Sequence, residues 1–554
     1  MSLSNRIRTS LVSFILIATI SLSFNVLSAS QPASNDVSRI ERENNQREQL
    51  LRQQLKQQQR LHEQQRPITK FEVAKPVIKP LPKIKSRCFG IFNIDLQGAD
   101  HLPENKSKDI INSYNNRCLS LNAINQLIKK LTSIYIEEGY VTSRVYIPKQ
   151  NLSKGTLTLI AIEGKIDSLD LTNAPKINPR TAFPELKDKV LNLRDIEQGI
   201  EQVNRLSSNQ VTLKLVPSSK TGKTIVQLSN EPRRRWQSSV NIDNSGQAST
   251  GEYQTRLYGS MDNLLGYNDF LSVSAQTSAI EGDSTNSSDN LTFRFEVPYG
   301  YWLFSIDTTN YRYKNEVQGQ STQFQSSGTS RQHTFNVQRI ISRGQVQKTS
   351  VKASLLRKVT KNFIEDSLLS TSSLALNTAT LNINQQRYYK NNKSLNLSAS
   401  INHGLDSHNT NLLTDLSFSM PLKVGTFSAY YTTQYTYQYS DEDLLASEEM
   451  SIGSQYTVRG FKDESVTGIK GMYWRHEAKL LQPFKIIPEI SPFIALDVGK
   501  VTTVENQYLA GIAMGAKMNK AGFSVSLTMS RALKRPSTFT KSKHQLYCSV
   551  SYWM

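Results

Sequence analysis

Residues 456–461, which read YTVRGF, place an arginine beside a glycine within a long region of alternating polar and apolar residues. An arginine in such a setting can form a two-pronged ion pair with a carboxylate, and the glycine permits a sharp backbone reversal. A surface turn with a solvated arginine is the simpler interpretation. The short stretch alone leaves both interpretations open.

The chain offers little of the chemistry of an enzyme active site. Its seven histidines stand in neither a G-x-S-x-G nor an H-E-x-x-H setting, and no G-x-x-x-x-G-K-[ST] phosphate-binding loop occurs. An outer-membrane hydrolase would need an activated nucleophile and a placed base. We therefore expect no enzyme, no catalytic residue, no metal site and no cofactor.

The first residues have the organisation of a secretory signal peptide. Arg6 and Arg8 precede an apolar run, which ends in small residues, and we expect cleavage between Ser28 and Ser30. Residues 1–29 are thus assigned to the signal. After this segment the sequence has no run of 18 apolar residues, which excludes a further spanning helix but not a membrane barrel of alternating strands.

The predicted export changes how the cysteines and the net charge are interpreted. Cys88 and Cys118 are 30 residues apart, and an exported chain allows them to form a disulfide; two buried thiols are the alternative. Cys548 is interpreted as a small apolar strand residue. The formal net charge of +20 would suggest nucleic acid as a partner in a cytosolic chain, and export argues against it.

The segment after the signal divides into a helix and a linker. Residues 30–66 are rich in glutamine and strong helix formers but have almost no core-facing apolar stripe. Such a helix bridges solvent or lies in a polar channel, and a disordered tail is the alternative. Residues 67–86 contain four prolines and five lysines, which indicates an extended tether.

Two small α/β domains follow, at residues 87–164 and 165–232. In the first, CFGIFNIDLQGA is predicted to be one strand, and a helical stripe from Ile124 to Tyr135 ends at Gly139. The second repeats this pattern, with a helix beginning at Asn192 and a hairpin formed by QVTLKLV and KTIVQL.

Residues 233–554 alternate between apolar and polar side chains, as in LNLSASIN at residues 395–402. A soluble β-sandwich gives the same pattern. The length of the region, its many tyrosines, and a last strand with Leu546, Cys548, Val550, Tyr552 and Met554 on one face favour a membrane barrel. We predict an all-β transmembrane barrel of about 16 antiparallel strands, with outer-membrane lipid around it.

Motifs along the whole mature chain resemble the two-partner secretion transporters of the haemolysin-activator family, the ShlB, FhaC and HecB type. They are GYVTSRVYIP, GTLTLIAIEGKI, LNLRDIEQGIEQVNRL, DNSGQASTGEYQ, EEMSIGSQYTVRGF and SPFIALDVGK. The resemblance implies two periplasmic POTRA domains, a barrel of 16 strands in the outer membrane of a Gram-negative bacterium, and an N-terminal amphipathic helix that plugs the pore.

The resemblance also implies the roles of particular residues and partners. Val458, Arg459, Gly460 and Phe461 would lie at the tip of a loop folded into the barrel, where Arg459 meets an inner-wall motif with Asp497 and Gly499. The partner would be one large exoprotein of haemolysin, adhesin or contact-dependent toxin type, bound by the POTRA domains and activated through secretion. A monomer is expected, with the barrel-assembly machinery as a partner during biogenesis.

A barrel-assembly insertase is the alternative function, since insertases share POTRA domains and an RGF-type loop. They usually have more POTRA repeats and lack the glutamine-rich helix, which favours the secretion transporter.

Overall fold

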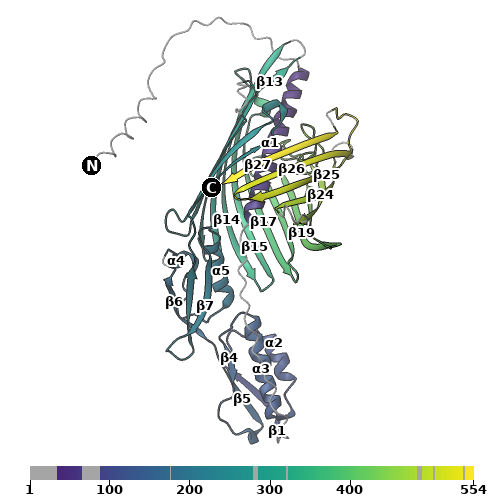
Figure 1. Cartoon of the computed structure of the whole chain (residues 1–554). Helices are drawn as coiled ribbons and strands as arrows, with labels where there is room; N and C mark the ends of the chain where they lie inside the picture. The colour runs from purple at the N-terminus through teal and green to yellow at the C-terminus, as the bar shows by residue number, and fades with distance from the viewer. Residues whose placement is uncertain are drawn as a thin grey trace, which may run out of the picture.

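The computed structural model describes residues 34–64, 88–174, 176–278, 285–319, 322–482, 489–502, 506–540 and 543–554. The predicted signal peptide and the predicted linker lie outside the described residues. Figure 1 shows a helix inside a barrel and two small α/β domains beyond one end of that barrel. Within the described part of the chain, no helix is long and apolar enough to cross a membrane.

The first α/β domain packs two helices on short sheets. Its elements are β1 Cys88–Ile91, β2 Asn93–Gln97, α2 Glu104–Asn112, β3 Arg117–Ser120, α3 Leu121–Glu137, β4 Arg144–Tyr146, a 3-10 turn at Leu152–Lys154, and β5 Thr156–Ile162. The Ser120 hydroxyl caps α3 by accepting from the Ala123 N–H at 3.2 Å. The predicted helical stripe is confirmed, because Ile124, Leu127 and Leu131 are buried in the domain core.

One strand prediction in this domain was wrong. CFGIFNIDLQGA forms two strands rather than one, because the chain bends at Phe92. The N–H groups of Phe92 and Asn93 both donate to the Gly155 carbonyl, so β1 pairs with β3 while β2 pairs with β5. A continuous β-like run could not reveal this change of partner.

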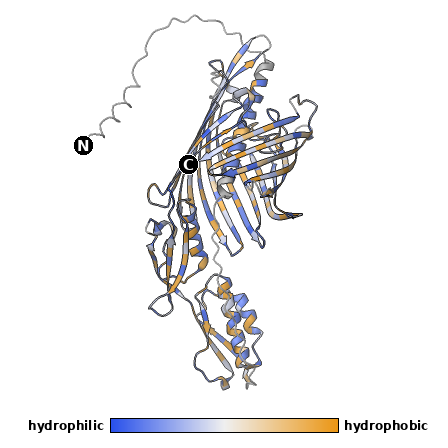
Figure 2. Ribbon diagram, viewed as in Figure 1, coloured by the Kyte–Doolittle hydropathy of each residue, from blue (hydrophilic) through white to orange (hydrophobic). Residues whose placement is uncertain are grey.

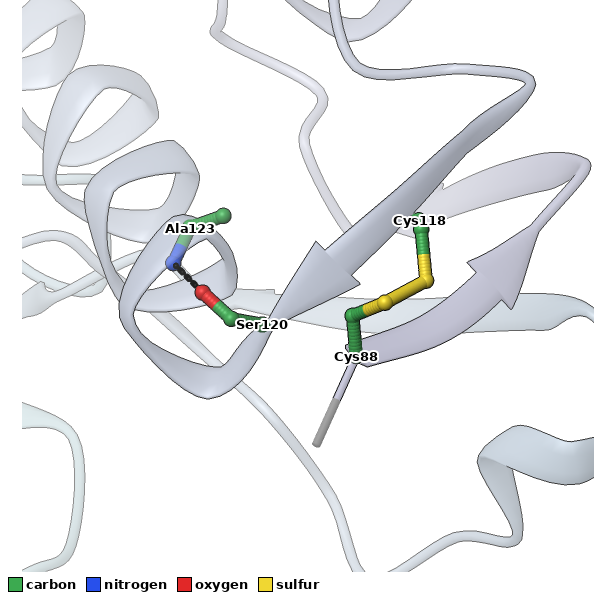
Figure 3. The surroundings of a disulfide bond; sticks show 4 residues. All are labelled: Cys88, Cys118, Ser120 and Ala123. Carbon is green, nitrogen blue, oxygen red and sulfur yellow. Dashed lines mark hydrogen bonds between the residues drawn. A yellow bond between two sulfur atoms is a disulfide. The ribbon is translucent and has the colours of Figure 1, made fainter. Parts of the chain in front are cut away.

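A disulfide joins Cys88 at the start of β1 to Cys118 on β3 (Figure 3). The two strands are antiparallel neighbours, and the Cα atoms of the two cysteines are 5.3 Å apart. The bridge therefore fastens the first strand of the domain to the strand that leads into α3.

The second α/β domain has a three-stranded sheet in the order β6-β8-β7. Its elements are β6 Lys165–Asn173, α4 Pro179–Ala182, α5 Leu193–Asn204, β7 Val211–Pro217 and β8 Lys223–Asn230. Asn192 caps α5 by accepting from the Arg194 N–H at 2.8 Å, and β7 and β8 form the predicted hairpin. Sequence reasoning missed β6, which pairs in parallel with β8.

The barrel is a closed antiparallel sheet. Among the described residues, 16 strands cross it, and a two-residue strand, β16 Ser367–Leu368, adds to the end of β15. The 16 strands are β9 Trp236–Asp243, β10 Gln254–Asp262, β11 Phe270–Thr277, β12 Ser287–Tyr299, β13 Trp302–Gln318, β14 Gln323–Arg343, β15 Gln347–Ile364, β17 Leu374–Tyr389, β18 Lys393–Gly404, β19 Thr410–Val424, β20 Phe427–Tyr439, β23 Lys470–Leu481, β24 Ile490–Thr502, β25 Asn506–Lys520, β26 Phe523–Lys534 and β27 His544–Trp553. The predicted barrel is confirmed.

Apolar residues alternate with polar ones along the strands (Figure 2). On β18, Leu397 and Ile401 are exposed on the outer face, while Asn402 hydrogen-bonds Asn411 across the inner face. A barrel with an apolar exterior and a polar interior can lie in lipid with every strand paired. The ring closes where β27 pairs with β9, from Ser549 opposite Asp243 to Trp553 opposite Ser239.

Candidate functional site

Two segments fill the interior of the barrel. One is the helix α1 Ser34–Gln64, seen in purple in Figure 1. The other is the segment between β20 and β23, residues 440–469, which we call the lumen loop. The lumen loop contains a small hairpin of β21 Met450–Ile452 and β22 Val466–Gly468.

Apolar contacts hold the lumen loop against the inner wall. Val458 and Phe461, from the YTVRGF stretch, are 0% and 3% exposed. They belong to one buried cluster with residues of the hairpin and of four wall strands, namely Met450, Ile452, Val466, Tyr473, Val501, Leu509 and Ala532. The loop is thus packed as a core is packed, and the surface-turn interpretation of YTVRGF is wrong.

Between these apolar residues, Arg459 makes a two-pronged contact with Asp497 on β24. The Arg459 Nε and Nη2 lie 2.6 and 2.8 Å from the two carboxylate oxygens, and the Arg459 backbone N–H donates to Oδ2 at 3.0 Å. The two residues are 5% and 1% exposed. A planar guanidinium with two parallel hydrogen bonds fixes orientation as well as distance, so this contact holds the loop in one position against the wall.

Glycines make room for this contact. Gly460 has φ +101°, which disfavours other residues, and a Cβ there would lie 2.7 Å from backbone atoms of β26. On the wall, a Cβ on Gly511 would lie 1.7 Å from the Arg459 carbonyl oxygen, and one on Gly499 would lie 2.9 Å from Val458. The loop backbone therefore rests directly on strands without side chains at these points.

Two further charged residues of β23 complete the cluster, and sequence reasoning missed both. Glu477 accepts a hydrogen bond from the Arg459 Nη1 at 2.9 Å. Arg475 donates from Nη1 to the Tyr456 carbonyl at 2.8 Å, and its Nε is 3.7 Å from Asp497. The alternation of WRHEAK places Arg475 and Glu477 on the inner face, which was the available signal.

The far side of the YTVRGF stretch contacts the strands where the barrel closes. Lys462 donates to the Asn244 carbonyl at 2.8 Å and pairs with Glu252 in the β9–β10 connection. The Tyr547 hydroxyl of β27 donates to the Phe461 carbonyl at 3.1 Å. The lumen loop thus lies along one continuous part of the wall, from β23 and β24 to β27 and the β9–β10 connection.

Helix α1 contacts the barrel wall through one apolar cluster near its amino end and through polar groups along the rest of its length. Near its amino end, Ile40 packs with Val317, Phe324 and Ile364 at the ends of β13, β14 and β15. One turn on, the Tyr313 hydroxyl donates to Asn44 at 2.7 Å. The cluster around Ile40 is the one buried hydrophobic cluster, among the described residues, that includes a residue of α1.

Charged pairs continue the attachment of α1. The Arg47 guanidinium lies over the Tyr313 ring at 4.2 Å, and Glu48 pairs with Lys358 and accepts from the Thr360 hydroxyl at 2.8 Å. Closer to its carboxyl end, Lys56 lies 3.1 Å from Asp415 of β19. Arg60 pairs with the same carboxylate, so a single wall acid holds two helix cations.

Helix α1 also touches the lumen loop. Gln53 donates to the Ser451 carbonyl at 3.0 Å and accepts from the Ser454 hydroxyl at 2.6 Å, and Gln49 donates to the Ala446 carbonyl at 2.6 Å. Between helix and loop lies a small, partly open cavity, lined by both segments, by the β9–β10 connection and by Tyr547 of β27. Together the helix and the lumen loop occupy the interior, so a wide passage through the barrel requires at least one of them to move.

The second α/β domain is fixed to the barrel by buried polar contacts. Gln202 donates to the Gly300 carbonyl at 3.0 Å, in the tight turn between β12 and β13. Arg205 pairs with Glu296 at 2.6 Å, with side chains 3% and 1% exposed. Tyr301 donates to Asp195 at 2.6 Å, and burial followed by this carboxylate raises the pKa of its hydroxyl.

The same interface holds Glu201 of α5 between two cations of the β14–β15 turn. The Arg343 Nη1 is 2.6 Å from Glu201, and Lys348 pairs with its other oxygen. Burial acts to raise the pKa of Glu201, but Lys348 and Arg343 outweigh it, so the pKa lies below the ordinary 4.5. The carboxylate is therefore charged at neutral pH.

The first α/β domain presents an open strand and an apolar face. Its sheet runs in the order β2-β5-β4, which leaves β4 as an edge. Tyr146 stands opposite Ile160 on neighbouring strands, and the two side chains are 51% and 36% exposed. The next outward residue of β5, Ile162, is 47% exposed. In the described residues, no group of three or more His, Cys, Asp and Glu side chains could hold a metal ion.

A closed 16-strand antiparallel barrel with an apolar exterior, which contains a helix and a folded-in loop and follows two small α/β domains, has the architecture of an outer-membrane β-barrel protein. Comparison with known families identifies the small domains as POTRA domains, a ShlB-type one at residues 89–164 and a second at 165–217. Residues 222–518 match the family of the haemolysin secretion/activation protein ShlB/FhaC/HecB. The chain belongs to this family, and it is an outer-membrane transporter of a two-partner secretion system.

Individual relatives agree with this assignment. The chain is 34% identical to the outer membrane transporter CdiB of Dickeya dadantii, with 71% of this chain and 73% of the relative aligned. It is 29% identical to the haemolysin transporter protein ShlB of Serratia marcescens, over 83% and 84%. The solved structure of CdiB from Escherichia coli matches with a TM-score of 0.79 at 26% identity, covering 95% of this chain and all of that one. The resemblance predicted from the motifs is confirmed.

Proposed function

We propose that this transporter exports one large exoprotein of the haemolysin, adhesin or contact-dependent toxin type through the lumen that α1 now occupies. The observation that carries the proposal is the attachment of α1, which is made mainly by side-chain ion pairs and hydrogen bonds. The pairs of Lys56 and Arg60 with Asp415 are an example. When the helix leaves, water can replace these polar contacts, whereas a helix with a wide apolar stripe would have to expose that stripe to water.

The exoprotein first binds to the POTRA domains in this proposal. An extended segment of it adds to the open edge of β4, where backbone hydrogen bonds give affinity, and apolar side chains contact the exposed face around Tyr146 and Ile162. A photo-crosslinking residue at Tyr146 should capture a purified exoprotein secretion domain. The same residue at Lys108, on the helical side of the domain, is the matched control.

Neither catalysis nor a nucleotide is part of the proposal. Folding of the exoprotein outside the cell gives export its direction, and activation follows from secretion rather than from a covalent change.

The transporter works as a monomer, because its own β27 and β9 close the ring. We also propose that residues 30–66, 87–164, 165–232 and 233–554 act as the plug, the two POTRA domains and the barrel.

A reversible lock on α1 tests the proposal. The Ser454 hydroxyl contacts the end of the Gln53 side chain, so cysteines at both positions should be joined by a short bis-methanethiosulfonate crosslinker, which attaches through two reducible disulfides. In a Cys548→Ser background, the crosslinked Gln53→Cys/Ser454→Cys variant should assemble but not secrete the exoprotein, and reduction should restore secretion. Each single-cysteine variant is a control and should secrete under both conditions.

Deletion of the helix gives a second, independent readout. A variant lacking residues 34–64 should conduct more ions in planar bilayers than the intact chain, because the lumen loop alone leaves part of the interior open. Full secretion by the crosslinked double-cysteine variant, or unchanged conductance after the deletion, would show that α1 does not close the transport path.

A further inference from the structure

The outside of the barrel carries a group of basic side chains on three neighbouring strands, β13, β14 and β15, near the strand ends that lie away from the POTRA domains. We call it the basic patch, and it consists of Arg312, Lys314, Arg331, Arg357 and Lys361, all exposed. Residues between them on the same strands point the opposite way. Tyr313 and Thr360, for example, are 6% and 5% exposed and contact α1. The five cations therefore face the surroundings of the barrel, not its lumen.

Strand register gathers these cations around Arg331. On β13, Arg331 stands opposite Asn310, and on β15 it stands opposite Val359. Arg312, Arg357 and Lys361 are each two residues from those positions. They occupy the diagonal neighbour positions of Arg331, where Cα atoms are about 7–8 Å apart. One bound anion could thus contact several of these side chains at once.

The basic patch begins where the lipid-facing surface ends. Ile306, Phe335 and Leu355 stand opposite one another across β13, β14 and β15, and are 47%, 46% and 57% exposed. Arg357 lies two residues further from the POTRA end than Leu355, a step of about 7 Å along the strand. The patch is therefore at the level of the lipid headgroups, in the leaflet that faces away from the periplasm.

Like charges at this density repel one another unless an anion lies between them. Within the described part of the chain, Arg312 makes one long contact with Asp289, at 3.9 Å between side chains that are 72% and 47% exposed. Arg331, Arg357, Lys314 and Lys361 form no ion pair with another described residue. On the outer face of β13, Glu316 stands two residues beyond Lys314.

We propose that the basic patch binds the phosphate groups of the phosphorylated glycolipid of the outer leaflet, lipopolysaccharide. Guanidinium groups match phosphate oxygens in pairs, and lysines add charge around them. Basic clusters beside the hydrocarbon region bind anionic headgroups in the same way. The bound lipid lies against β13–β15, the strands whose inner faces hold Ile40, Asn44 and Glu48 of α1.

The test uses the full-length transporter purified in detergent. Arg331→Gln/Arg357→Gln removes two patch cations, and Arg339→Gln/Arg387→Gln removes two exposed arginines at the POTRA end of β14 and β17 as a matched control. Native mass spectrometry counts retained lipopolysaccharide, and thermal unfolding follows added lipopolysaccharide, its dephosphorylated form, phosphatidylglycerol or inorganic phosphate. Heat-modifiable gel migration confirms that each variant is folded.

We expect the intact chain and the control to retain the glycolipid, and the patch variant to bind it at least tenfold more weakly. Only phosphorylated lipopolysaccharide should stabilise the intact chain. Equal binding by the patch variant and the control would overturn the proposal, as would equal stabilisation by the dephosphorylated form. An equal effect of phosphatidylglycerol would show a general anionic surface, and an equal effect of inorganic phosphate would show a free-ion site; either result also overturns it.

Discussion

Arg459 of the lumen loop lies against Asp497 of β24, with its Nε 2.6 Å and its Nη2 2.8 Å from the two carboxylate oxygens. Both side chains are almost completely buried. Because neither charge has much access to water, each depends on the other, and on Glu477 and Arg475 beside them, for compensation. Together with the apolar cluster around Val458 and Phe461, this pair holds the loop in its position in the lumen.

Removal of the guanidinium should release the loop. In Arg459→Ala, Asp497 is left buried without its partner, at a cost of about 3–5 kcal/mol to the seated loop. Secretion of the exoprotein should fall by more than tenfold, while heat-modifiable gel migration shows an assembled barrel. Arg459→Lys keeps the charge but loses the planar fork, so secretion should recover only in part. Normal secretion by Arg459→Ala would mean that the pair has no role in transport.

A methyl group placed under the loop should have a similar effect without removing a charge. In Gly511→Ala, the new Cβ would lie 1.7 Å from the Arg459 carbonyl oxygen, so the loop or the strand must move. Gly259→Ala on β10 is the matched control, because nothing lies within 4 Å of a Cβ there. Secretion measured for both should fall severalfold for the first and stay unchanged for the second. Equal secretion would show that the loop adapts easily.

Loss of the disulfide should weaken only the first POTRA domain. Closing the loop between Cys88 and Cys118 contributes roughly 3 to 4 kcal/mol in the chain-entropy model. A Cys88→Ser/Cys118→Ser variant of the full chain should show faster proteolysis of this domain while the barrel stays intact. Mass spectrometry without reduction should recover the crosslinked peptide from the unaltered chain. Recovery of two alkylatable thiols instead would contradict the bridge.

Acid should loosen the second POTRA domain from the barrel. The pKa of Glu201 is lower in the docked state than its ordinary 4.5, so its contribution is complete above that value and is lost as the pH falls through the lowered pKa. Hydrogen exchange in α5 should therefore rise below about pH 4.5. In Glu201→Gln, exchange should already be faster at neutral pH and depend less on acid. Identical profiles for the two chains would rule out this carboxylate as the sensitive group.

Patterns of local sequence predicted the barrel, both POTRA helices with strong stripes, and the helix that lies in the lumen. Alternation and helical periodicity are local properties of the sequence, so they can be recognised without knowing which residues will be in contact. The place of Arg459 came from family resemblance, since no local rule links residue 459 to residue 497. Glu477 and Arg475 were missed for the same reason, because which inner-face charges meet depends on strand register and on the path of the loop.

The break at Phe92 was missed because it depends on a carbonyl far along the chain, at Gly155. The short helix α2 was also missed. It has no side-chain cap, and its predecessor is Pro103. The contacts between the second POTRA domain and the barrel could not be predicted, because Glu201 resembles an ordinary exposed helix residue until the β14–β15 turn is placed beside it.

Helix α1 runs through a closed ring with its amino end among the loops and its carboxyl end toward the POTRA side (Figure 1). At 31 residues it is about 46 Å long. The helix is therefore enclosed by the closed barrel and can leave only along the barrel axis. A small tag near Ser34 would be accessible from outside the cell while α1 fills the lumen, and would become inaccessible if α1 withdrew toward the POTRA side. In the export proposed above, labelling of this one position from outside the cell would report whether the lumen is open.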